Sequence, residues 1–120
     1  MKYMIMMLGD ANAMREVKSQ EWIREMIEFM GKMNTELIES GELVDGQGLA
    51  DPSTAKVVRI ADGVPVATDG PYAEAKESLA GYWIVDVVDE ARAVEIAAKV
   101  VAFTGEPLEV RQVMDAPPEV

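Results

Sequence analysis

The sequence predicts a single α+β domain of the ferredoxin-like split βαβ type, enlarged by an added β-hairpin. Residues 3–8 and 79–88 are almost continuously apolar, as expected of central strands that are buried on both faces. Two further segments repeat apolar residues at helical spacing, and Asp62-Gly63 separates two β-branched runs, which is a strong hairpin signal. With 120 residues, 49% of them hydrophobic, the chain can bury one core. We expect residues 1–115 to form this domain and residues 116–120 to form a loose tail.

The two predicted helices differ in length and in the residues that they bury. The first covers about residues 16–40 and ends before Gly41. Its predicted core residues are Trp22, Met26, Met30, Met33 and Leu37. The second covers about residues 89–103, begins at Asp89, and is predicted to bury Val94, Ala97, Ala98 and Val101. The other strands are predicted at residues 43–50, 55–61, 64–68 and 107–113. The resulting order is β-α-β-hairpin-β-α-β.

This topology leaves one face of the sheet without a cover. Both helices lie on the same face, and the central strands 3–8 and 79–88 also carry apolar residues on the opposite face. Tyr82 or Trp83 joins that second face, depending on the register. A second copy of the chain would cover it, so we predict a homodimer in which two sheets pack face to face.

Composition excludes several classes of site. The chain has no cysteine and no histidine, so it has no disulfide, no Ser-His-Asp or Cys-His catalytic group and no histidine-ligated metal. Its formal charge of −11 would repel phosphate backbones, so we expect no direct contact with nucleic acid. No apolar run is long enough to span a membrane, and we expect a cytoplasmic protein without a cofactor.

The turn around Asp69-Gly70-Pro71 contains the best candidate site residues. An Asp69 carboxylate desolvated against Tyr72 or Tyr82 could act as a general acid or base, with Lys76 or Arg59 stabilising a developing oxyanion. We therefore name Asp69 as the candidate catalytic residue, and the candidate substrate-binding residues are Tyr72, Glu74, Lys76, Arg59 and Tyr82. Turn chemistry alone offers the alternative that Asp69 caps the turn by accepting backbone N–H groups, and that Gly70 takes a positive φ.

Two other patterns favour a structural interpretation over a functional one. The spacing of six methionines is more typical of core packing than of a copper site or a ligand groove: Met4, Met6, Met7, Met26, Met30 and Met33. Gly46 and Gly48 lack the lysine and the strand-loop-helix context of a phosphate loop. They indicate an irregular strand or a bulge.

Three segments together resemble the DGPF subgroup of the YCII-related proteins: residues 44–49, residues 68–82 with their DGPY and AEAKE runs, and residues 107–113. The resemblance implies a dimeric α+β barrel. Many of these proteins have a histidine on the first helix paired with an aspartate, but this helix has no histidine, so that pair is not carried over.

Two functions are compatible with this resemblance. The first is binding of a small metabolite in a cleft between sheet and helices, with Asp69 as acid or base if the protein is a cofactor-independent enzyme. The second is a non-catalytic regulatory or protein-interaction module, with a partner linked to sigma-factor-type transcription control.

Overall fold

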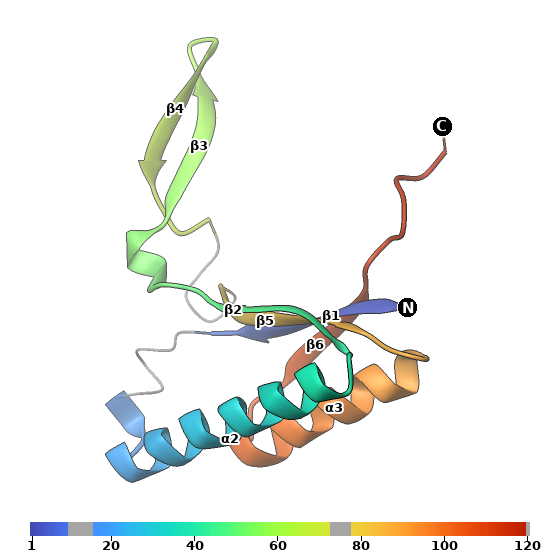
Figure 1. The fold of residues 1–120 in the computed structure, drawn as a ribbon. Helices are drawn as coiled ribbons and strands as arrows, with labels where there is room; N and C mark the ends of the chain where they lie inside the picture. The colour runs from blue at the N-terminus through green and yellow to red at the C-terminus, as the bar shows by residue number, and fades with distance from the viewer. Residues whose placement is uncertain (10–15, 73–77, 120) are drawn as a thin grey trace.

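The computed structural model describes residues 1–9, 16–72 and 78–119 and confirms the predicted order of elements. Four antiparallel strands form the main sheet in the order β2-β5-β1-β6, which is the strand order of a ferredoxin-like fold (Figure 1). The elements of this unit are β1 (Lys2–Leu8), α2 (Gln20–Glu39), β2 (Leu43–Gly48), β5 (Leu79–Asp86), α3 (Glu90–Thr104) and β6 (Leu108–Gln112).

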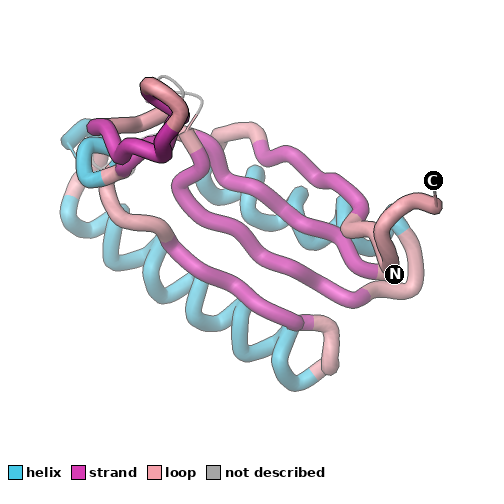
Figure 2. Tube along the Cα trace, turned by 90° about the horizontal axis from the view of Figure 1, so that it is seen from above, coloured by secondary structure: helices cyan, strands magenta, loops and turns pink. Residues whose placement is uncertain are grey.

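Both helices lie on one face of the sheet, and the core fills the layer between them (Figures 1 and 2). Strand β1 contributes Tyr3 and Ile5, and β5 contributes Trp83 and Val85, because alternate residues of a strand point to the same side. Helix α2 starts four residues later than predicted, after the N-cap Ser19, whose hydroxyl accepts the backbone N–H of Trp22. The core residues of the helices are Met33, Leu37, Ala93, Ile96, Ala97 and Val100.

The predicted core face of α3 was wrong for two of its four residues, because Ala97 is buried and Val101 is partly buried, but Val94 and Ala98 are not. The structure buries Ala93, Ile96 and Val100 along with Ala97, whereas Val94 is 50% exposed and Ala98 is also exposed. Both sets of residues have helical spacing, so periodicity alone cannot separate them. Contact with the sheet determines which set is buried, because the observed face places the fully buried Ile96 against the sheet.

The predicted hairpin is present as a separate two-stranded sheet of β3 (Lys56–Ala61) and β4 (Val64–Asp69), preceded by the 3₁₀ turn η1 (Pro52–Thr54). Asp62 and Gly63 have φ values of 51° and 78°, as a type I′ turn requires. The hairpin rises from the side of the sheet opposite the helices (Figure 1). This arm gives the chain a radius of gyration of 16.7 Å, above the roughly 14 Å expected of a compact domain of this length.

Gly70 at the base of the hairpin is required by a close approach and not by its φ angle. Its φ lies outside the left-handed region, contrary to the expectation for this turn. The Gly70 N–H donates to the carbonyl of Ala55 at 2.8 Å, and a Cβ atom on Gly70 would lie 3.1 Å from that same oxygen. A side chain here would push the end of β4 away from the start of β3.

A bidentate ion pair connects the start of β2 to α3. Arg92 donates to both carboxylate oxygens of Glu42, at 2.9 and 2.8 Å, and the Glu42 side chain is only 17% exposed. These hydrogen bonds lower the pKa of Glu42 to about 2, against its ordinary value of 4.5, and raise that of Arg92. Arg92 also contacts Glu95, whose side chain is 63% exposed.

Replacing Gly70 by alanine should loosen the hairpin. We expect Gly70→Ala to reduce the hydrogen-exchange protection of the β3 and β4 amides by roughly tenfold, equivalent to about 1.4 kcal/mol. The matched control is Gly31→Ala on α2, where a Cβ atom meets nothing within 4 Å. Unchanged protection of the hairpin in Gly70→Ala would contradict the close-approach explanation.

The Glu42–Arg92 pair predicts a specific acid sensitivity. A carboxylate whose pKa is lowered on folding adds stability above its ordinary pKa, and this stability is lost as pH falls from about 4.5 through about 2. We expect Glu42→Gln to cost roughly 1–3 kcal/mol at neutral pH and to flatten the pH dependence of urea melts in this window. Glu95→Gln is the control and should cost less than about 1 kcal/mol. A pH profile of Glu42→Gln parallel to that of wild type would refute this role.

Candidate functional site

The described residues form a cleft between α2 and the end of the sheet where β2 finishes and β5 begins. Three glycines on the helix-facing side of the two strands leave this end without side chains. A Cβ atom on Gly46 would lie 3.1 Å from Cδ1 of Trp83, which identifies its side of the sheet. Gly48, two residues further along β2, points the same way into open space, and it pairs with Gly81 on β5. Of the three glycines, Gly48 faces the open space, whereas a Cβ atom on Gly81 would lie 3.0 Å from the carbonyl oxygen of Gln47. The absence of three side chains at this end of the sheet leaves the cleft open beside α2.

The cleft has a volume of about 260 Å³ and is lined mainly by apolar groups. Helix α2 contributes Met26, Met30 and Asn34, and the sheet contributes Met7 and Trp83 along with the glycines. Methionine at these positions was predicted to fill the core, but of the six methionines considered only Met33 is buried. The methionines of α2 border an open space because the part of the sheet opposite them consists of glycines, which have no side chains to fill it.

One polar contact shapes the inner wall of the cleft. The Trp83 indole N–H donates to Oδ1 of Asn34 at 2.9 Å, which fixes the orientation of the amide. The amide nitrogen of Asn34 has no hydrogen-bond partner among the described residues, so it can donate to a bound molecule. None of the residues that line the cleft carries a formal charge. The site therefore favours an uncharged ligand with a hydrogen-bond acceptor.

The candidate catalytic residue Asp69 lies outside this cleft, at the end of β4. Its side chain is 88% exposed, and Oδ1 accepts a hydrogen bond from Nζ of Lys56 at 2.5 Å. Among the described residues, the carboxylate accepts no hydrogen bond from a backbone N–H, and the turn continues into residues outside the described part of the chain, so the predicted turn cap stays a prediction. Glu74 and Lys76 lie outside the described residues.

Two of the remaining candidates meet at the base of the hairpin. The guanidinium of Arg59 lies 5.4 Å from the centre of the Tyr72 ring, in cation–π geometry. Tyr72 is 82% exposed and borders a second, more open hollow of about 440 Å³ between η1 and the start of β5. Asp69 does not line this hollow, so the structure does not assemble the candidate residues around one reaction centre.

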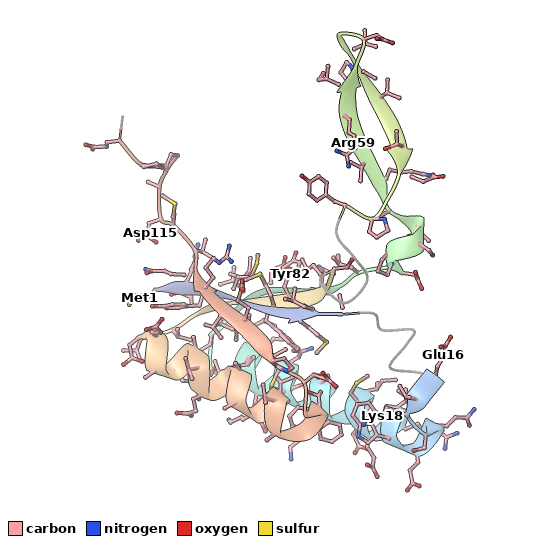
Figure 3. The ribbon with its side chains drawn as sticks, turned by 180° about the vertical axis from the view of Figure 1, so that it is seen from behind. Met1, Glu16, Lys18, Arg59, Tyr82 and Asp115 are labelled. Atoms are coloured by element: carbon pink, nitrogen blue, oxygen red, sulfur yellow. The ribbon has the colours of Figure 1, made fainter. Side chains whose placement is uncertain are left out.

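Tyr82 lies on the face of the sheet opposite the helices (Figure 3). Its hydroxyl donates to Oδ2 of Asp45 at 3.0 Å, and this hydrogen bond raises the pKa of Tyr82. The other carboxylate oxygen of Asp45 accepts the N–H of Gly46 and the amide of Gln47. The contact between Asp45 and Tyr82 depends on the register between β2 and β5.

Sequence reasoning did not identify Asn34 or Gly81 as site residues. Gly81 interrupts an otherwise apolar strand, and a glycine inside a strand often indicates a close approach or a bound ligand. Gly81 could therefore have been identified from the sequence. No comparable signal exists for Asn34, because one amide on a helix flank resembles any solvated residue.

The described residues contain no cluster of three or more acidic side chains placed to hold a metal ion, and no described helix is long and apolar enough to cross a membrane. No curated protein matches the chain. The YCII-related domain family matches residues 1–116, which is nearly the whole sequence. On the basis of this match and the ferredoxin-like fold, the chain belongs to the YCII-related domain family.

Proposed function

We propose that this domain binds a small, uncharged and mainly apolar molecule in the cleft between α2 and the β2–β5 end of the sheet. The observation that carries the proposal is the set of three glycines that leaves this end of the sheet open beneath Met26 and Met30. If the space had no ligand to bind, side chains would be expected to fill it, because unfilled space in a core reduces stability.

The shape and chemistry of the cleft limit the ligand. A volume of about 260 Å³ lies slightly below the range of roughly 300–1,000 Å³ that is usual for small-molecule sites, so the ligand must be small. Bare glycine backbone accepts a flat molecule at close range, and methionine side chains adapt to its outline. The Asn34 amide supplies a donor for a carbonyl or similar acceptor. These features support a compact ligand with one polar group, such as a small aromatic or carbonyl compound.

Catalysis by Asp69 remains a separate proposal. An acid or base must lie within hydrogen-bond reach of the atom that it protonates or deprotonates, and Asp69 is highly exposed and does not border the cleft. Its exposure favours binding without chemistry as the function of the cleft. The DGPY run supports a place in the DGPF subgroup, and a sigma-factor-linked regulatory partner remains a prediction from that resemblance.

A side chain at Gly48 should block the cleft. A thermal-shift screen of small neutral compounds identifies a ligand, because a ligand that binds only the native state raises the melting temperature. We expect Gly48→Leu to weaken that ligand at least tenfold, since Gly48 points into the open space. Gly31→Leu, an equal change at an open glycine on the exposed side of α2, should leave affinity unchanged. Equal affinity in wild type and Gly48→Leu would exclude the cleft as the binding site.

Substitutions of Asp69 distinguish binding from catalysis. The exposed Lys56–Asp69 pair should contribute less than about 1 kcal/mol, so Asp69→Asn and Asp69→Ala should both melt close to wild type. We expect both variants to keep full affinity for the cleft ligand in isothermal titration calorimetry. Turnover of that ligand by wild type that disappears in Asp69→Asn would establish an enzyme and overturn the binding-only function.

A further inference from the structure

Helix α2 places a polar donor beside a methionine thioether at the wall of the cleft. Met30 and Asn34 are four residues apart on this helix, so they are neighbours on one of its faces. Side chains of an α-helix lean toward its N-terminus, which directs the Asn34 amide toward Met30. Met26 continues the same row one turn earlier, and all three residues line the cleft. The row therefore presents two thioethers and one amide to a bound molecule.

The thioether of Met30 is accessible to a small oxidant through the cleft. Its side chain is partly exposed even though it packs against the core, whereas Met33 on the same helix is only 5% exposed. The chain has nine methionines and no cysteine, so methionine provides all of its sulfur. Oxidation of sulfur in this protein therefore means conversion of a thioether to a sulfoxide.

We propose that Met30 is a sulfoxidation site whose oxidation closes the cleft to its ligand, a form of regulation that rests on the ligand binding proposed above. A peroxide transfers one oxygen atom to Sδ of Met30. The peroxide O–O bond breaks, an S–O bond forms, the sulfur loses two electrons, and the second peroxide oxygen leaves as water. The apolar thioether thereby becomes a polar sulfoxide with a strong hydrogen-bond acceptor beside Asn34.

Asn34 gives the new oxygen its effect on binding. The amide oxygen Oδ1 of Asn34 already accepts the Trp83 indole N–H at 2.9 Å, and the amide nitrogen has no hydrogen-bond partner among the described residues. A sulfoxide oxygen on Met30, one helical turn away, is within reach of this nitrogen. It then occupies the N–H donor that a carbonyl ligand needs. The oxidised side chain thus competes with the ligand for the same hydrogen bond.

The position of Met30 separates it from the other methionine of the row. Met26 is eight residues from Asn34, about 12 Å along the helix axis at 1.5 Å per residue, so a sulfoxide there cannot reach the Asn34 amide. Both methionines line the same cleft and both are partly exposed. Met26 is therefore the matched control, because its oxidation changes the polarity of the cleft without occupying the amide.

Oxidation of the folded protein with hydrogen peroxide tests the contact without any ligand. Peptide mass spectrometry should find an added oxygen on Met30 and none on the buried Met33, while Met114, which is 64% exposed and outside the cleft, reports the peroxide dose. The side-chain amide resonances of Asn34 in ¹⁵N-labelled protein should then shift, because the amide gains a hydrogen bond. Met30→Leu should keep the Asn34 resonances unchanged after peroxide, whereas Met26→Leu should respond like wild type.

The same samples are then titrated with 4-fluoroacetophenone, a small neutral aromatic ketone whose binding is followed by fluorine nuclear magnetic resonance. Peroxide should weaken its binding at least tenfold in wild type and in Met26→Leu, but less than about threefold in Met30→Leu. Met30→Gln, which carries a carbonyl acceptor at this position, should weaken binding without peroxide.

Two results would overturn the role of Met30: a thioether that stays unmodified in the folded protein, or an oxidised Met30 that leaves the Asn34 resonances unchanged. Equal loss of ketone binding in oxidised Met30→Leu and oxidised wild type would also overturn it. Untreated protein that does not bind the ketone would instead contradict the proposed ligand class. The Asn34 amide readout distinguishes these two failures, because it needs no ligand.

Discussion

The two central strands, β1 and β5, carry apolar side chains on both faces, whereas the helices of one chain cover only one face. On the helix side, Ile5 and Val85 are fully buried. On the other side, Met4 and Ile84 remain partly exposed. The two described helices therefore cover one face of the central strands, and the apolar side chains on the other face remain partly exposed among the described residues. This exposure is the physical reason to expect a partner on the open face.

On the helix-covered side of the sheet, side chains are missing at one end, where the space between the sheet and α2 would otherwise be filled. Gly48 and Gly81 leave the end of the sheet bare, and Met26 and Met30 of α2 border the resulting space. The two faces thus serve different purposes in our account. The cleft is proposed to accept a small neutral molecule, and the open face is predicted to be covered by a second copy of the chain.

Periodicity predicted the order of strands and helices, and Asp62-Gly63 predicted the hairpin, since both signals are local in sequence. The face of α3 was mispredicted because Val94 and Ile96 both fit a helical repeat, and only contact with the sheet separates them. A cleft between sheet and helices was predicted, but the glycines that form it were missed for a related reason. Gly48 and Gly81 are far apart in sequence, and their common gap appears only when β2 pairs with β5. The residue types around Asp69 indicated a turn but could not indicate how exposed its carboxylate would be.

The most direct test of the cleft is nuclear magnetic resonance of the indole N–H groups of ¹⁵N-labelled protein during addition of a ligand from the thermal-shift screen. The protein has two tryptophans, and only Trp83 borders the cleft, where its indole N–H donates to Asn34. Trp22 contacts Phe103, with the ring centres 5.5 Å apart, and serves as the internal control. Our account predicts a saturable shift of the Trp83 indole resonance with little change at Trp22. A ligand that binds without moving the Trp83 resonance would contradict it.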